Sequence, residues 1–141
     1  MNTTESTTPA MQSDLEYARG EIRRLNDLIV AILKAHDDLG YGVVITDGSQ
    51  IRYVNEAFAK MSGYSFEELL ALPSFFGMVP EVERTKLMQR MQERLRGEAV
   101  RDHYTTALTH KSGTWIDLEV VVKVAHLDAI PHVIAIVKDI A

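Results

Sequence analysis

A short stretch, ITDGSQIRYVNEAF at residues 45–58, constrains the fold of this chain more than any other segment. The pair Asp47-Gly48 is a turn signal between two short runs rich in β-branched residues, so the stretch predicts an antiparallel hairpin. Asn55 follows the second run directly and is suited to cap a helix. The chain is therefore expected to pass from a hairpin into a helix without an intervening loop.

The rest of the chain alternates between helical and strand periodicities, interrupted by glycine, proline and other turn signals. The predicted elements are, in order, a helix over residues 13–38, strands over 41–47 and 51–54, short helices opening at Asn55 and Ser65, an irregular piece over 74–79, a helix over 81–96, and strands over 101–109, 114–124 and 132–140. This order predicts one mixed domain preceded by a helical extension.

The helical extension has apolar residues at alternating spacings of three and four, as in a coiled coil. We name this pattern the seam; it consists of Leu15, Ala18, Ile22, Leu25, Ile29, Ile32, His36 and Leu39. Over residues 28–33 the apolar stripe widens, which suits a helix that meets a partner helix first and then also packs on a sheet. We therefore predict a homodimer. Its candidate interface residues are Leu15, Ala18, Ile22, Leu25, Leu28, Ile29 and Ile32. The alternative is one amphipathic helix lying on its own domain's core.

Composition excludes several classes of function. A net charge of −5 leaves no basic field for a nucleic-acid backbone, and the absence of cysteine excludes disulfides, thiolate catalysis, cysteinyl-flavin photochemistry and Cys-based zinc sites. Residues 1–12 are predicted to form a disordered tail and lack the features of a secretory signal. The longest apolar run, residues 28–33, is far shorter than the roughly twenty residues of a membrane span. We expect a cytoplasmic protein without membrane contact.

Several segments together resemble the PAS family of sensory domains, over about residues 39–141. They are ITDGSQIRYVN, AFAKMSGYSFEELL, MVPEVER, KSGTW and VKDIA. Two departures from the family pattern are Ser112-Gly113, where Asp-Gly is usual, and a final Ala141 where the family closes with threonine. The resemblance implies an α+β fold, with a five-stranded antiparallel sheet and helices on one face, preceded here by an amphipathic helix. It also implies a pocket between the helices and the sheet.

Haem is disfavoured as a cofactor, because haem sensors of the family carry an axial histidine on the long helix and residues 81–96 contain none. The five histidines lack the spacing of a metal site. No phosphate loop, nucleophile motif or buried carboxylate pair predicts an enzyme. A small apolar metabolite is the ligand hypothesis, because flexible methionines suit an adaptable pocket. Its candidate residues are Phe58, Met61, Phe75, Phe76, Met78, Leu87, Met88, Met91, Tyr104, Ile116 and Leu118.

These observations predict a sensory or regulatory domain that dimerises through its N-terminal helix and relays a signal to an effector domain or partner protein. Two-component or cyclic-dinucleotide signalling would fit such a role. The alternative is a ligand-free interaction module in which the same apolar residues form a filled core, and a small enzyme is least favoured. The sequence leaves open the signal, the effector and the orientation of the dimer.

Overall fold

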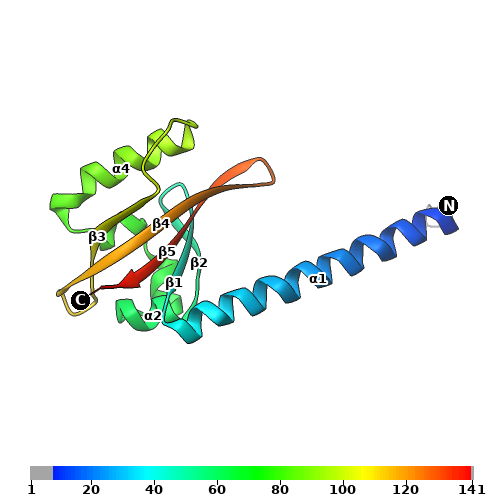
Figure 1. Cartoon of the computed structure of the whole chain (residues 1–141), viewed down its shortest axis with the longest axis horizontal. Helices are drawn as coiled ribbons and strands as arrows, with labels where there is room; N and C mark the ends of the chain where they lie inside the picture. The colour runs from blue at the N-terminus through cyan, green and yellow to red at the C-terminus, as the bar shows by residue number, and fades with distance from the viewer. Residues whose placement is uncertain (1–7, 141) are drawn as a thin grey trace. The chain divides into compact units, whose positions relative to one another are not determined.

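The computed structural model describes residues 8–140, and the chain divides into two compact units, Met1–Ala35 and His36–Ala141. The first unit contains most of one long helix, α1 (Pro9–Leu39), whose last turn belongs to the second unit. The second unit contains the sheet and the shorter helices (Figure 1).

Helix α1 begins at Pro9, four residues before the predicted start at residue 13. The Met11 amide donates to the Thr8 hydroxyl at 3.1 Å, and proline is favoured in the first helical position because its missing N–H would be unpaired there anyway. Residues 1–7 of the predicted tail lie outside the described part of the chain. At the other end Gly40 has φ 77°, and the Tyr41 amide donates to the His36 carbonyl at 2.9 Å, which closes the helix as a Schellman motif.

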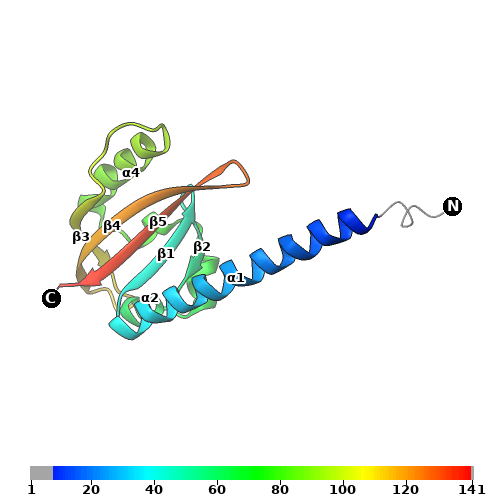
Figure 2. The ribbon, with the colours of Figure 1, turned by 45° about the vertical axis from the view of Figure 1, so that its right-hand side comes forward.

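The sheet has five antiparallel strands in the order β2-β1-β5-β4-β3, which confirms the predicted fold class (Figure 2). The strands are β1 (Gly42–Asp47), β2 (Gln50–Val54), β3 (His103–Thr109), β4 (Trp115–Leu127) and β5 (Ile130–Asp139). The first hairpin turns at Gly48 with φ 60°, as its turn signal predicts. Strands β1 and β5 are neighbours although they are far apart in sequence, so the sheet joins the two ends of this unit.

The hairpin of β4 and β5 is longer than predicted. The strands were expected to stop at residue 124 and to resume at 132, because Asp128 and Pro131 are loop signals. Instead a two-residue turn, Asp128-Ala129, connects them with φ 52° and 64°. Both residues adopt the left-handed conformation that a tight hairpin turn requires. Pro131 pairs with His126 near the start of β5, where a strand tolerates the missing donor.

Three short helical segments that begin at side-chain caps, and a longer helix whose N-cap residue Pro80 makes no side-chain cap bond, cover one face of the sheet. They are α2 (Glu56–Ser62), α3 (Phe66–Ala71), the 3₁₀ helix η2 (Phe75–Met78) and α4 (Glu81–Leu95). The side chain of Asn55 caps α2, and Gly63 ends it with φ 79°. Ser65 and Glu68 form the predicted capping box of α3. Segment 74–79, expected to be irregular, contains η2 because Ser74 accepts from the Phe76 amide.

The core lies between these helices and the inner face of the sheet. Its buried members are Val44, Ile51, Val54, Phe58, Ala59, Leu69, Phe76, Met78, Val79, Leu87, Leu108, Leu118, Val120, Val122, Val133 and Val137. They come from all five strands and all four covering helices. Alternation along each strand supplies the inner face, as the period of two in β4 predicts.

The outer face of the sheet also carries apolar residues. Ile45 pairs with Ile134, and Val121 pairs with Ile136, and all four are half-buried. These pairs account for the predicted apolar character of β5 on both faces. The predicted packing of residues 28–33 on this face stays a prediction.

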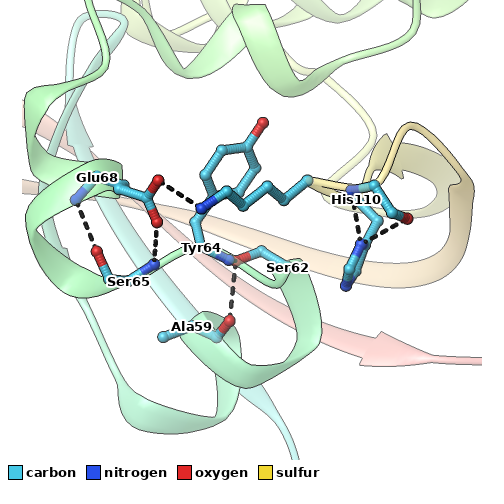
Figure 3. Close-up of polar contacts among 8 residues, drawn as sticks. Ala59, Ser62, Tyr64, Ser65, Glu68 and His110 are labelled. Atoms are coloured by element: carbon cyan, nitrogen blue, oxygen red, sulfur yellow. Dashed lines mark hydrogen bonds and ion pairs between the residues drawn. The ribbon is translucent and has the colours of Figure 1, made fainter.

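Helix α3 is held to the turn between β3 and β4 by Lys111. Its Nζ lies 2.7 Å from Glu68 Oε2, and its amide donates to the Ser62 carbonyl at 2.9 Å. Figure 3 shows Glu68 and Ser65 closing the capping box beside Tyr64, over which the Lys111 ammonium lies. The hydrogen bond from Lys111 lowers the pKa of the Glu68 carboxyl, and the backbone bond to Ser65 adds to this. The turn KSG is thereby fixed against the α2–α3 connection.

Candidate functional site

An apolar cavity lies between the inner face of the sheet and the segments η2 and α4. Its volume is ≈ 60 Å³, and its lining is Val44, Thr46, Phe75, Phe76, Leu87, Met91, Arg94, Tyr104, Thr106, Leu108, Leu118, Val120, Val122, Val133, Ala135 and Val137. Ligand pockets for drug-sized molecules occupy about 300–1,000 Å³, so this cavity is much smaller. It has room for about four to six water-sized groups.

The cavity brings together six of the eleven candidate pocket residues: Phe75, Phe76, Leu87, Met91, Tyr104 and Leu118. The other five lie elsewhere. Phe58 and Met78 are fully buried in the core, whereas Met61 and Ile116 pack against its edge. Met88 is 41% exposed on α4 and does not line the cavity. Binding of a ligand by the six lining residues stays a prediction.

Sequence reasoning missed the polar part of the lining. Thr46 is only 4% exposed, and its hydroxyl has no hydrogen-bond partner among the described residues. The hydroxyl of Thr106 is buried without a partner in the same part of the chain. An unpaired buried hydroxyl costs about 1–3 kcal/mol. The signal was the period of two in the strands, because Thr46 lies on the same face as Val44, and Thr106 on the same face as Tyr104 and Leu108.

Tyr104 joins this cavity to the charged side of α4. The guanidinium of Arg90 lies 4.8 Å from the centre of the Tyr104 ring. Burial raises the pKa of the Tyr104 hydroxyl, and the positive charges of Arg94 and Arg90 only partly oppose that effect. The hydroxyl therefore stays protonated at neutral pH and can donate a hydrogen bond into the site.

The last turn of α1 is tied to α2 and β1 within the second unit. Asp37 Oδ1 accepts from the Ala57 amide at 2.8 Å, which supplies a second cap at the start of α2. Asn55 Oδ1 accepts from both Val43 and Phe58, at 2.8 and 3.0 Å, and its Nδ2 donates to the Tyr41 carbonyl at 2.9 Å. Asn55 is 1% exposed, so these bonds are shielded from water.

The start of β1 lies directly against α2. A Cβ added at Gly42 would meet Val137 Cγ2 at 2.7 Å and Phe58 Cδ1 at 3.0 Å, so only glycine fits between them. Burial, followed by the negative charge of Asp37, raises the pKa of Tyr53 on β2. The end of α1, the start of α2 and the first two strands therefore form one connected junction.

The family model for the PAS domain matches residues 40–141, which is more than half of the chain. The chain belongs to the PAS domain family. Its recognised part begins where α1 ends and includes the whole sheet. A comparison with curated proteins found no significant match. We refer below to His36–Ala141 as the PAS unit.

Solved structures of PAS domains have the same fold. The PAS domain of an HTR-like protein from Haloarcula marismortui is 18% identical, with a TM-score of 0.64, and covers 86% of this chain and 99% of its own. The PAS domain of a Desulfitobacterium hafniense protein is 22% identical, with a TM-score of 0.62 and coverages of 70% and 92%. A PAS domain from a two-component sensor histidine kinase is 21% identical, with a TM-score of 0.58 and coverages of 78% and 96%. The TM-scores show that the fold is shared.

Outside the PAS unit, the candidate dimer residues occupy one stripe of α1. None of the residues of α1 is buried in the single chain, and Leu15, Ile22, Leu25, Leu28, Ile29 and Ile32 are each 49–58% exposed. Because the helix begins at Pro9, Met11 lies one further step along the same pattern and is 49% exposed. Sequence reasoning missed Met11 because it assigned residues 1–12 to the tail.

Two other kinds of site are a metal centre and a membrane-spanning helix. Within residues 8–140, no three acidic or histidine side chains are grouped so that they could hold a metal ion. His36 lies on the seam, with its ring 6.3 Å from the ring of Tyr41. No helix in the described part of the chain is both long and apolar enough to cross a membrane.

Proposed function

We propose that this chain is a sensory PAS domain that dimerises through α1 and relays the state of its cavity to an effector outside the chain. Membership of the PAS family supports a sensory signalling role. One similar structure comes from a two-component sensor histidine kinase, which supports the same role. The proposal contains no catalytic step.

The exposed stripe of α1 is the observation that carries the proposal. Helix α1 has 31 residues, and its apolar residues recur with the spacing of a coiled coil while remaining about half exposed in the single chain. Burial of apolar surface is worth roughly 25 cal/mol per Å². A second copy of the same helix would cover this surface along its whole length. We therefore assign the stripe to a homodimer.

The side chains on and beside the seam favour a parallel pair. In the middle of the seam, β-branched Ile22 and Ile29 occupy one of the two core positions of the repeat and Leu25 the other, which is the combination of parallel two-stranded coils. Leu15 at the first position, and Ala18 and Ile32 at the second, depart from that combination. Asp14 and Arg19 flank the core five residues apart. In a parallel pair these two residues of opposite charge meet across the interface, once on each side.

The junction at the end of α1 provides the route for a signal. A guest in the cavity would alter the packing of the core in which Phe58 is fully buried. Phe58 is bonded through its amide to Asn55, and the adjoining Ala57 amide is bonded to Asp37 of α1. A shift of α2 therefore acts on the last turn of α1 and changes how two paired helices cross.

The dimer is tested by placing one acidic residue on or off the seam. The variant Ile29→Asp would bury a charge between two helices, so we expect a monomer by light scattering at micromolar concentration. Val30→Asp introduces the same charge beside it, outside the seam, at a side chain that is 63% exposed. We expect this control to remain dimeric. A dimeric Ile29→Asp, or a monomeric wild-type chain, would contradict the proposal.

A ligand-free interaction module is the second candidate function, and the small cavity volume favours it. With ≈ 60 Å³ of free space, the side chains themselves fill most of the region between α4 and the sheet. Denaturing extraction of the purified protein, with mass spectrometry and an absorbance spectrum, distinguishes the two. A stoichiometric guest supports the sensor, whereas an empty protein with no absorbance band beyond its aromatic residues supports the interaction module.

A further inference from the structure

One border of the cavity collects hydrogen-bond donors from two elements. Tyr104 and Thr106 lie two residues apart on β3, so both side chains point to the inner face of the sheet. Arg94 of α4 lines the same cavity, and Arg90, one turn earlier, stacks on Tyr104. Arg94, Tyr104 and Thr106 therefore line this border of a largely apolar cavity, and Arg90 stacks on Tyr104 without lining the cavity itself.

The arginines of this border have no carboxylate partner in the described part of the chain. Arg90 Nη1 is buried and has no hydrogen-bond partner there. Arg94 donates to the Arg101 carbonyl at 2.9 Å, which leaves its charge unpaired. Within α4, Lys86 pairs with Glu83 and neither arginine takes part. A half-buried cation without an anion is costly, so this border is suited to receive one.

The neighbouring acidic group is already engaged. Arg94 helps to lower the pKa of Asp102, but the main cause is the hydrogen bond from Lys123, whose Nζ lies 2.6 Å from Asp102 Oδ2. Asp102 is therefore held by Lys123 on the exposed side of the sheet edge. Among the described residues no further carboxylate pairs with Arg90 or Arg94, so we look for the matching anion in a guest molecule.

We infer that the cavity binds a short-chain aliphatic carboxylate. Its carboxylate lies at Arg90 and Arg94, which can grip both oxygens, and the hydroxyls of Tyr104 and Thr106 donate to the same group. Its alkyl chain lies in the apolar space beside Leu87, where ≈ 60 Å³ accommodates about four to six carbon-sized groups. The assignment rests on the sensory function proposed above, since both require the cavity to admit a guest.

Pentanoate and 1-pentanol provide a matched pair of probes, because they share a chain length and differ in the charged head. Calorimetric titration of the full chain is expected to show tighter binding of pentanoate, by roughly tenfold or more, as charge-assisted hydrogen bonds allow. The variants Arg90→Gln and Arg94→Gln should each reduce that preference and leave 1-pentanol binding unchanged. Arg96→Gln is the control, since Arg96 is exposed at the end of the same helix and paired with Glu98.

Three results would overturn the assignment: no binding of pentanoate at millimolar concentration, equal binding of both probes, or equal loss of preference in all three variants. In each case Arg90 serves only to stack on Tyr104. Thr106→Val provides a second test that preserves side-chain shape, and it should weaken pentanoate binding but not 1-pentanol binding. Light scattering of the same wild-type sample separates the two proposals, because a dimer that binds no pentanoate refutes the ligand class and leaves the dimeric module intact.

Discussion

Helices α1 and α4 both carry an apolar stripe, and the stripe of α4 is covered within its own unit. Helix α4 buries Leu87 and presents Met91 to a cavity against the sheet. Helix α1 is about twice as long and buries no residue in the single chain. In α4 this periodicity stabilises a domain, and in α1 we propose that it forms a dimer interface.

The largest expected effect is on the free energy of unfolding, and it distinguishes the core residue of α4 from the seam residue of α1. Leu87→Ala removes a side chain that is 7% exposed in the core, so it should lower the free energy of unfolding of the PAS unit by about 2–5 kcal/mol. Ile29→Ala should leave the same transition unchanged. Trp115, the single tryptophan, lies on β4 and reports this transition by fluorescence in a urea titration. An equal shift in both variants would show that α1 is part of the domain core.

The junction between α1 and α2 should show an effect of intermediate size on the free energy of unfolding. Asp37→Ala removes the acceptor of the Ala57 amide, which should cost about 1 kcal/mol, as loss of a helix cap does. Hydrogen exchange of the Ala57 amide should accelerate in the same variant. Asp38→Ala is the matched control because that neighbouring side chain is exposed. Unchanged exchange at Ala57 would remove Asp37 from the relay.

A smaller effect of opposite sign is expected in the cavity. Thr46→Val replaces an unpartnered hydroxyl by a methyl group of similar size, so it should be neutral or stabilising by up to about 1 kcal/mol. Thr105→Val, at an exposed position of β3, is the control. Thermal unfolding of the two variants would measure the difference. Marked destabilisation by Thr46→Val would mean that the hydroxyl is already satisfied.

The smallest expected effect on stability comes from surface ion pairs, which occur both on α1 and on the PAS unit. Lys111 lowers the pKa of the Glu68 carboxyl, so the pair contributes stability at neutral pH, and that stability is lost as the pH falls through the lowered pKa. Glu68→Gln keeps the capping box and removes only the charge, so it should flatten this acidic pH dependence slightly. Glu21→Gln, which removes an exposed ion pair of α1, should leave the Trp115 transition unchanged at every pH. A pH profile of Glu68→Gln identical to that of the wild type would refute the contribution.

Local signals explain why much of the fold could be predicted. The turn at Gly48, the Asn55 cap and the capping box at Ser65 each depend on a few adjacent residues, and each is present in the structure. The prediction was wrong where a local turn signal is outweighed by strand pairing. Asp128 and Pro131 indicate a loop, yet pairing of β4 with β5 over many residues outweighs them. The start at Pro9 was missed because Thr8 and Pro9 stand in a threonine-rich segment that reads as a tail.

The candidate site was predicted less completely because a cavity depends on the register of distant strands. Large apolar residues such as Phe75 and Met91 could be chosen from helical periodicity. Thr46 was overlooked because the phase of a strand indicates which face a residue lies on, whereas the pairing of β1 with β5 decides which inward residues border the cavity. Arg90 and Arg94 resemble the solvated face of a helix in sequence, and only the fold places them beside Tyr104.

The central claim, that the seam of α1 lies against the seam of a parallel second copy, is tested most directly by cross-linking. The chain contains no cysteine, so one introduced cysteine is unique. Ala18→Cys places a thiol on the seam, away from the middle of α1, and Ala31→Cys places one off it. Mild oxidation should convert Ala18→Cys into a covalent dimer of twice 15.8 kDa and leave Ala31→Cys largely monomeric on a non-reducing gel. Equal cross-linking of both variants, or of neither, would contradict a parallel pair.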